Sequence, residues 1–259
     1  MCLLVLAWQA HPHYRLILAA NRDEFHARAA APLAKWQDEQ ILAGRDLAAG
    51  GTWLGIDRQR RVGVVTNFRE LPASPSAGPS RGRLILDYFR EDHSAGDFLA
   101  KLKPTASDYA GFNILLSDAS ELCYASNRAS GFARRLEPGI YGLSNRLLDT
   151  PWPKLTRVRA SFEATLAQAA EPDARELLAM LDDRTPSAAS DDAYPANLAP
   201  EWRRALSAPF VLHPVYGTRC STVVLLRSSG AVQMVERRFD AAGDCSGETK
   251  LELDAVVWR

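Results

Sequence analysis

Two short apolar runs open the chain, and a polar connection that contains a proline separates them. Residues 3–8 are continuously apolar, residues 14–20 form a second such run, and residues 9–13 connect the two. Short apolar runs bounded by turn residues are typical of buried strands. The pattern therefore predicts an antiparallel hairpin that is buried on both faces. In such a hairpin, the Asn-Arg-Asp-Glu sequence at residues 21–24 lies beside Cys2, where the first strand begins.

The rest of the chain alternates between strand patterns and helix patterns. Apolar or alternating runs predict strands at residues 53–57, 62–68, 112–117, 122–126, 132–136, 140–143, 222–226, 232–239 and 251–258. Amphipathic stretches predict helices at residues 81–91, 95–103, 151–169 and 173–181, with a short one at 202–206. Strands and helices in separate blocks are typical of an α+β fold in which helices cover sheets.

Several segments between these elements lack a regular pattern. The Ala-rich segment around Pro32 is expected to form a loop or a short helix. Residues 71–79 and 185–192 are polar or rich in proline, and we expect both to form loops. Ser80 stands directly before a helix pattern and is expected to cap that helix.

Composition and charge narrow the possible function classes. The chain has 259 residues, 47% of them apolar, which allows one large domain or two closely packed ones. Lysine and arginine together number 31, as do aspartate and glutamate, so the basic excess typical of nucleic-acid binding is absent. No apolar run approaches the ~18 residues of a membrane span, and the first residues lack the features of a secretory signal. We therefore expect a cytoplasmic protein with neither a nucleic-acid partner nor a membrane span.

Cysteine and histidine spacing argues against a metal site. No Cys-x-x-Cys pair occurs among the four cysteines, which are Cys2, Cys123, Cys220 and Cys245, so neither zinc nor a disulfide framework is expected. Cys123 lies in an apolar run and is expected in the core. His11 and His13 flank a loop proline and are expected to be solvated, whereas His26 follows the acidic pair closely enough to neighbour a site.

The position of Cys2 gives it a chemical possibility that the other cysteines lack. Methionine aminopeptidase removes Met1 efficiently when the second residue is small, and cysteine qualifies. The mature chain would then begin with a thiol of ordinary pKa ~8.5 and an α-amine of pKa about 7.7–8 on one residue, which is a nucleophile with its own base. Taken alone, a cysteine at this position is also a small apolar residue that starts a strand.

Seven short motifs stand out along the chain. They are Met-Cys at 1–2, Asn-Arg-Asp-Glu-Phe at 21–25, Gly-Gly-Thr-Trp-Leu-Gly at 50–55, Thr-Asn-Phe-Arg at 66–69, Ser-Arg-Gly at 80–82, Gly-Leu-Ser-Asn at 142–145 and Tyr-Gly-Thr-Arg at 216–219. Together they resemble the NRDE family, also called transport and Golgi organisation protein 2. That family resembles the N-terminal-nucleophile hydrolases, most closely the penicillin V acylase and bile salt hydrolase branch. The resemblance implies one domain over residues 1–259, built as a four-layer αββα sandwich with two antiparallel sheets face to face and helices outside.

The resemblance also implies roles for the residues at the start of the chain. Cys2 would be the nucleophile and its α-amine the base, while Arg22 would lower the pKa of the thiol and Asp23 would hold the amine. Adjacent side chains on a strand point to opposite faces, so Arg22 and Asp23 can both face Cys2 only where the strand bends. Glu24 therefore remains an alternative acidic partner.

Further site residues follow from the later motifs. By resemblance, Asn67 would lie beside the oxyanion hole, Asn145 would donate to the oxyanion, and Arg219 would contact Cys2. The paired glycines before Trp53 indicate a positive φ angle or a close backbone approach, which could admit a substrate. The expected substrate-binding residues are Glu24, Gly51, Trp53 and Phe68.

These motifs predict hydrolysis of a linear amide or thioester of a small acyl substrate through an acyl-enzyme on Cys2, without a cofactor. The resemblance leaves one alternative open, because the family is associated with haem trafficking and lipid homeostasis. In that case the protein would be a non-enzymatic carrier, and haem would be ligated by His13, His26 or the Cys2 thiolate.

Overall fold

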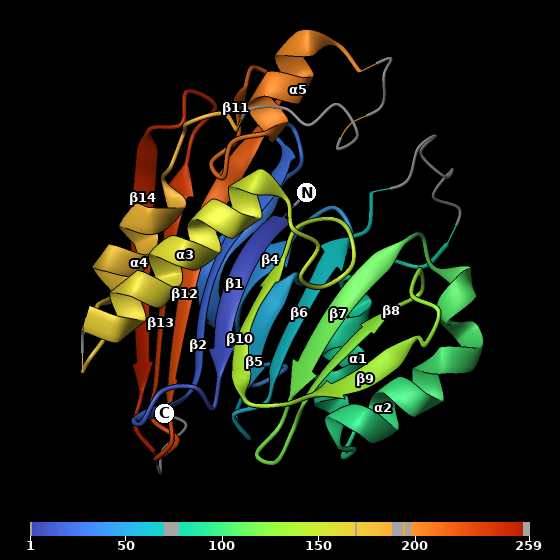
Figure 1. Cartoon of the computed structure of the whole chain (residues 1–259). Helices are drawn as coiled ribbons and strands as arrows, with labels where there is room; N and C mark the ends of the chain where they lie inside the picture. The colour runs from blue at the N-terminus through green and yellow to red at the C-terminus, as the bar shows by residue number, and fades with distance from the viewer. Residues whose placement is uncertain (1, 70–77, 169, 188–193, 195–197, 256–259) are drawn as a thin grey trace.

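Two antiparallel sheets packed face to face form the centre of the computed structural model, which describes residues 2–69, 78–168, 170–187, 194 and 198–255 (Figure 1). The first sheet has the order β10 (Gly139–Leu143), β1 (Cys2–Trp8), β2 (Tyr14–Phe25), β12 (Tyr216–Arg227), β13 (Val232–Phe239) and β14 (Cys245–Leu253), with the short β11 (Leu212–His213) beside β12. The second has the order β3 (Ala30–Trp36), β4 (Ile41–Asp46), β5 (Leu54–Asp57), β6 (Val62–Asn67), β7 (Phe112–Ser117), β8 (Leu122–Ser126) and β9 (Ala133–Leu136).

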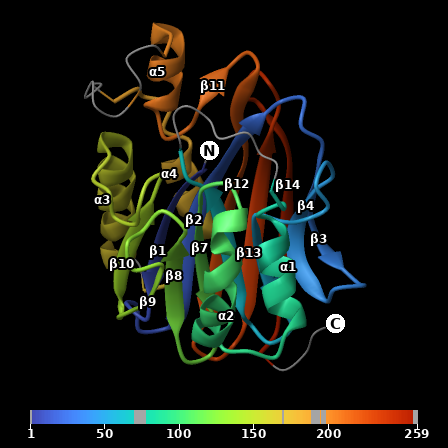
Figure 2. The same ribbon diagram turned by 90° about the vertical axis from the view of Figure 1, so that its right-hand side faces the viewer.

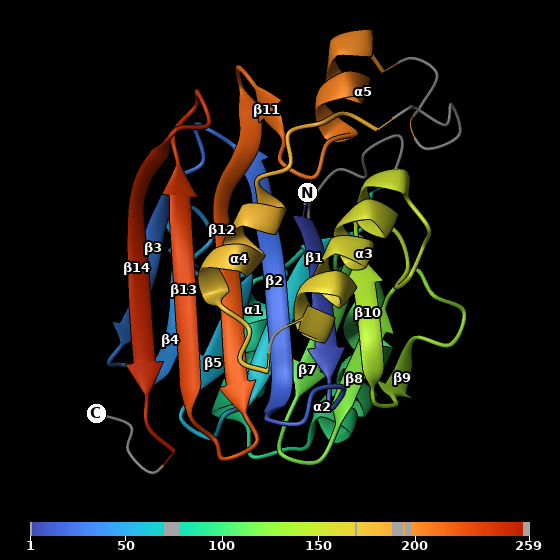
Figure 3. The ribbon, with the colours of Figure 1, turned by 60° about the vertical axis from the view of Figure 1, so that its left-hand side comes forward.

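Helices cover the outer face of each sheet. The helices α3 (Pro153–Gln168) and α4 (Ala174–Leu181) lie against β1 and β12 of the first sheet (Figure 3). The helices α1 (Arg83–Arg90) and α2 (Ala95–Leu102) cover the second sheet, and the 3-10 helix η1 (Lys103–Asp108) follows α2 (Figure 2). The short α5 (Pro200–Leu206) lies beside β11 at one end of the molecule. This order of layers confirms the predicted αββα sandwich.

The alternation of side chains along β1 explains why this strand is apolar throughout. Leu4, Leu6 and Trp8 point into the core between the two sheets. Leu3, Val5 and Ala7 point to the other face, where they pack in a second core with α3 and α4. A strand that is buried on both faces needs apolar side chains at every position, so the predicted hairpin is confirmed.

The segment around Pro32 forms the edge strand β3, which corrects the expectation of a loop or short helix. An edge strand has one unpaired side, and a register shift between Ala31 and Ala34 accommodates the proline there. The neighbouring strand β4 was not predicted at all, although its first residues are buried. Both strands contain small or polar residues, which obscure the apolar or alternating run that is typical of a strand.

Two further expectations need correction. The helix α1 begins at Arg83 after Gly82 and has no side-chain cap; Ser80 contributes only its backbone carbonyl, which accepts a hydrogen bond from the Arg83 N–H at 3.1 Å. The last strand spans Cys245–Leu253 instead of 251–258, because most side chains of this edge strand are exposed and polar. Residues 71–77 and 188–192 of the two expected loops, and 256–258 of the expected last strand, lie outside the described residues. Among the described residues, no helix is both long and apolar enough to cross a membrane.

Candidate functional site

Cys2 lies directly opposite Arg22 in the register between β1 and β2, and Arg22 in turn lies opposite Cys220 of β12. Paired residues on neighbouring antiparallel strands point to the same face of a sheet. Cys2 and Arg22 therefore both face the space between the two sheets, and each is only 7% exposed. The hairpin thus brings Arg22 beside Cys2, as its length and connection predicted.

Asp23 follows Arg22 directly and points to the opposite face of β2, toward the helices. Its Oδ1 accepts a hydrogen bond from the Thr218 hydroxyl at 2.7 Å, and its backbone carbonyl accepts one from the Tyr216 hydroxyl at 2.8 Å. A bulge in β12 lies beside this point, because Thr218 pairs with Asp23 and Cys220 pairs with Arg22, which leaves Arg219 as the extra residue. The guanidinium and the carboxylate thus flank Cys2 from two faces of the sheet.

Burial dominates the titration of both groups. It raises the pKa of the Cys2 thiol, while the positive charges of the N-terminal amine and of Arg22 act in the opposite direction. Burial likewise raises the pKa of the Asp23 carboxyl, and the amine and Lys154 oppose it. The thiol therefore depends on nearby positive charge to become a thiolate near neutral pH.

Glu24, the alternative acidic partner, contacts the chain that follows β2. Its Oε1 accepts a hydrogen bond from the Phe25 N–H at 2.9 Å, and its Oε2 lies 4.0 Å from the Arg28 guanidinium. The charge of Asp23, by contrast, acts on the Cys2 thiol. The geometry therefore favours Asp23 over Glu24 as the acidic partner.

A cavity of about 450 Å³ opens in front of Cys2. The predicted site residues that line it are Cys2, Arg22, Asp23, Glu24, Trp53 and Asn67. Further lining comes from the end of β4 and from residues 78–82, which precede α1. Segments far apart in the sequence therefore meet around one thiol, and their catalytic or binding roles remain predictions.

Asn145 contacts Asn67 and is not among the residues that line this cavity. Its Nδ2 donates a hydrogen bond to the backbone carbonyl of Asn67 at 3.1 Å, and its own backbone carbonyl accepts one from the Arg69 N–H at 2.8 Å. Among the described residues, the buried Oδ1 of Asn145 has no hydrogen-bond partner. The residue has a φ of 59°, in the left-handed region that asparagine tolerates better than most residues. Its predicted role as an oxyanion donor remains a prediction.

Two predicted substrate-binding residues do not line the cavity. A Cβ on Gly51 would lie 2.5 Å from the carbonyl carbon of Gly82, so this glycine permits close contact with backbone. Gly50 has a φ of 74°, which confirms the expected positive angle at the glycine pair. Phe68 donates its backbone N–H to the Gly111 carbonyl at 2.9 Å and is absent from the cavity wall.

Arg219 holds the turn after β2. Its Nη1 donates hydrogen bonds to the backbone carbonyls of Phe25, His26 and Arg28 at 3.0, 3.0 and 3.2 Å. It lines a second, smaller cavity and not the cavity in front of Cys2. These contacts of Arg219 are with the chain that follows the Arg22 strand, and its expected contact with Cys2 stays a prediction.

Lys154 of α3 is a site neighbour that the sequence analysis missed. The side chain is 2% exposed, and its Nζ donates a hydrogen bond to the Leu206 carbonyl at 2.8 Å. Burial lowers the pKa of this lysine to about 8, and the charge of Asp23 opposes the shift. The sequence did carry a signal for this burial. Lys154, Val158 and Phe162 are spaced four residues apart, which places all three on the buried face of the helix.

Arg69, in the Thr-Asn-Phe-Arg motif, is a second neighbour without a predicted role. Its guanidinium lies over the Tyr194 ring, 4.8 Å from the centroid, and 5.3 Å from that of Trp152. Burial lowers its pKa, and its charge acts on the nearby Lys154. The outer side of the site is therefore rich in buried positive charge.

Comparison with known proteins places this chain in a family. The model of the family described as "Transport and Golgi organisation 2" matches residues 1–241. The chain belongs to the transport and Golgi organisation 2 family. It is 35% identical to the "Transport and Golgi organization 2 homolog" of Mus musculus over 257 residues and 34% identical to the Homo sapiens homolog, with 92% of each chain covered.

The solved structures give a fold for this member of the transport and Golgi organisation 2 family. It resembles the C2A mutant of a conjugated bile acid hydrolase from Clostridium perfringens with a TM-score of 0.53 and 8% sequence identity, over 100% of this chain and 94% of the other. The family member therefore has the fold of an N-terminal-nucleophile hydrolase, as the motifs implied. At this identity the likeness concerns the fold alone.

Proposed function

We propose that this family member hydrolyses a linear amide or thioester of a small acyl substrate through an acyl-enzyme on Cys2. The observation that carries the proposal is the direct cross-strand pairing of Cys2 with Arg22 at the wall of a cavity of about 450 Å³. A guanidinium beside a buried thiol favours the thiolate, which is the nucleophilic form.

Removal of Met1 supplies the base. The α-amine of Cys2 then accepts the thiol proton while sulfur attacks the substrate carbonyl carbon, which gives a tetrahedral oxyanion. The protonated amine returns the proton to the leaving nitrogen or sulfur, and the acyl group remains on Cys2 as a thioester. A water molecule, deprotonated by the same amine, attacks that thioester and releases a carboxylic acid and the free thiol.

The surrounding residues suit the charges in these steps. Arg22 opposes the effect of burial on the thiol, and the charge of Asp23, which acts on that thiol, would also stabilise the protonated α-amine of Cys2. Asn67 lines the cavity, and its backbone carbonyl fixes the side-chain amide of Asn145. The second N–H of that amide would stabilise the oxyanion, a kind of contact worth about 10²–10³ in rate.

A carrier of haem or lipid is the alternative function. Haem ligation by a histidine has weaker support, because neither His13 nor His26 lines the cavity in front of Cys2. The Nε2 of His26 lies 3.0 Å from the His213 carbonyl, and His13 is exposed. Among the described residues that line this cavity, Cys2 is the one with a side chain of the haem-ligating kind.

Intact-protein mass spectrometry tests the proposal. The purified protein should lack Met1, and incubation with a panel of N-acyl amides and acyl thioesters should add an acyl mass to Cys2, which disappears as the acid is released. Cys2→Ala should abolish both adduct and turnover, whereas Cys245→Ala, at an exposed cysteine, should change neither. Full activity with Met1 retained would rule out the α-amine of Cys2 as the base. No adduct with any substrate, together with a Soret shift on haem titration, would contradict hydrolysis. Cell fractionation would test the expected cytoplasmic location separately.

A further inference from the structure

A row of thiols and guanidiniums crosses the inner face of the first sheet. Cys2 pairs with Arg22, Arg22 with Cys220, and Cys220 with Arg238, on the adjacent strands β1, β2, β12 and β13. Because paired residues share a face, all four side chains point into the space between the sheets. The row continues to Gly247 of β14, which pairs with Arg238.

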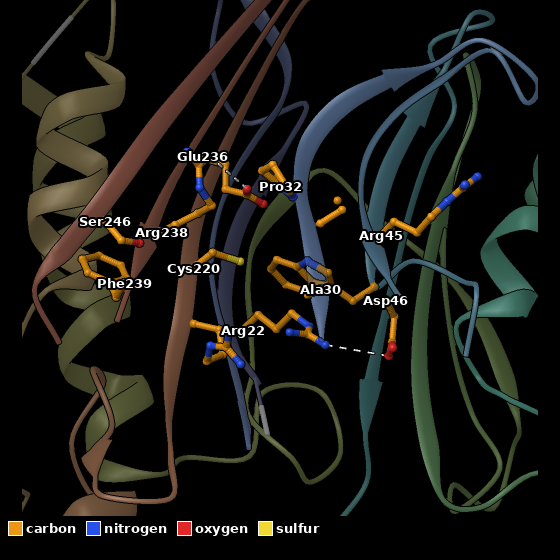
Figure 4. A pocket seen from close by; sticks show the side chains of 14 residues that line it. Arg22, Ala30, Pro32, Arg45, Asp46, Cys220, Glu236, Arg238, Phe239 and Ser246 are labelled. Carbon is orange, nitrogen blue, oxygen red and sulfur yellow. Dashed lines mark ion pairs between the residues drawn. The ribbon is translucent and has the colours of Figure 1, made fainter. Parts of the chain in front are cut away.

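Between the two arginines of this row lies a second cavity, of about 110 Å³ (Figure 4). That volume equals roughly four water molecules in the liquid. Arg22, Cys220, Glu236 and Arg238 line it from the first sheet, and β3 and β4 close it from the second. The exposed Pro32 and Ser246 lie at its rim, so the cavity is open to solvent at the sheet edges.

Arg22 is buried without the hydrogen bonds that such a group normally makes. Among the described residues, its closest ionic partner is the Asp46 carboxylate at 3.8 Å, beyond the 2.7–3.2 Å of a normal hydrogen bond. Asp46 is already engaged by the Arg28 Nε at 2.8 Å and by the N–H groups of Ala48 and Ala49. A buried guanidinium beside a cavity, with N–H groups not satisfied by protein, points to a ligand that accepts them.

Arg238, on the other side of the cavity, is half-buried and makes one side-chain hydrogen bond among the described residues. Its Nη1 lies 3.8 Å from Glu236, whose Oε1 accepts the Leu33 N–H at 2.8 Å instead. The same Nη1 donates to the Thr249 hydroxyl at 2.7 Å. Burial raises the pKa of Glu236. Four arginines and two acidic residues line the cavity, so it has an excess of positive charge.

The side chains that line this cavity indicate which kind of ligand it binds. Two guanidiniums suit the planar, two-oxygen geometry of a carboxylate, and the remaining wall includes apolar side chains from Ala31, Pro32 and Phe239. We propose that the cavity between Arg22 and Arg238 binds a carboxylate group carried on a short aliphatic chain. Binding there does not require that Cys2 turn over a substrate. It does couple to Cys2, because the bound carboxylate pairs with the guanidinium that favours the thiolate.

The test uses propionate as the probe and propionamide as its neutral counterpart, in titrations followed by saturation-transfer NMR on the whole protein. Propionate should bind at least tenfold more tightly than propionamide. Arg238→Met should weaken propionate binding at least tenfold. The matched control is Arg237→Met, because Arg237 points to the opposite face and pairs with Glu248 at 2.9 Å, and this variant should bind as the unchanged protein does.

A second variant keeps the arginine in place. A Cβ on Gly247 would lie 2.3 Å from the Arg238 Nη2, so Gly247→Ala should displace the guanidinium at an edge strand and weaken binding without removing a charge. If Arg238→Met fails to fold, the affinity of Gly247→Ala for propionate tests the proposal instead. Propionate should also slow alkylation of Cys2 in the unchanged protein but not in Gly247→Ala. Equal affinity for propionate and propionamide, binding that survives in both variants, or binding of inorganic phosphate alone would overturn the proposal.

Discussion

The side-chain amide of Asn145 holds the backbone carbonyl of Asn67 at 3.1 Å, although 78 residues separate the two in the sequence. The contact joins the end of β6 to the turn that follows β10. One N–H of the amide is thereby fixed on the backbone of Asn67, and the other is the one that the proposed oxyanion contact requires. Asn145 is therefore the residue at which the proposed oxyanion site can be tested most directly.

Asn145→Gly should slow acylation of Cys2 by about 10²–10³ if the amide stabilises the oxyanion. Glycine accepts the φ of 59° without strain, so this variant removes the side chain alone. Asn145→Ala should show the same kinetic loss with about 1 kcal/mol of additional destabilisation, because alanine resists the left-handed region. Single-turnover acylation and urea unfolding separate the two effects. Acylation at the normal rate in Asn145→Gly would exclude this amide from the oxyanion site.

Arg22→Ala should raise the apparent pKa of the Cys2 thiol, because the guanidinium opposes the effect of burial. The pH profile of alkylation should move to higher pH, and Arg22→Lys should restore part of the shift. Stability should fall by about 1–3 kcal/mol, since Asp46 keeps its pair with Arg28. Arg28→Met is the matched control, because it disturbs the same carboxylate, whereas Arg22 is the residue that pairs with Cys2 across the strands. An unchanged profile in Arg22→Ala would place the guanidinium outside the thiol's influence.

Arg219→Met should behave differently from Arg22→Ala. The loss of donors to three backbone carbonyls should lower the free energy of unfolding by about 1–3 kcal/mol. Alkylation of Cys2 should change little, because Arg219 lines the other cavity. A thermal melt and an alkylation time course on the same sample measure both. Loss of Cys2 reactivity without loss of stability would support the contact expected from the sequence.

Lys154 should give the protein a dependence of stability on pH in the alkaline range. Its pKa falls from 10.5 to about 8 on folding, mainly through burial, so between these values the unfolded chain binds more protons than the folded one. The free energy of unfolding therefore rises with pH across that window, by at most about 3 kcal/mol from this group. Relative to the unchanged protein, Lys154→Met should lose this rise in urea titrations at pH 7, 8.5 and 10. Parallel curves for both proteins would mean that Lys154 titrates as an exposed lysine does.

The sequence by itself determined the elements whose burial shows directly in the pattern of apolar residues. The hairpin of β1 and β2 is apolar on both faces, so its strands, its connection and the placement of Arg22 beside Cys2 could be predicted from pattern and length. The pattern of elements alone indicated an α+β fold, and the αββα order of layers came from the family resemblance that the motifs carry. By contrast, β3 and β14 are edge strands with exposed side chains, and the proline of β3 obscured its pattern. Edge strands depend on pairing with a neighbour, which local sequence does not encode.

Only the tertiary structure determined on which face of the first sheet each charged side chain lies. One-residue alternation along β2 sends Arg22 between the sheets and Asp23 toward the helices, and a bulge in β12 turns Arg219 to the carbonyls after β2. Lys154 is buried against this site only because α3 packs on the first sheet. The row from Cys2 to Arg238 likewise arises from the register of strands that are distant in sequence. Register and packing depend on long-range contacts, whereas motifs are local. The motifs therefore identified the candidate site residues, and the fold determined which residues contact them.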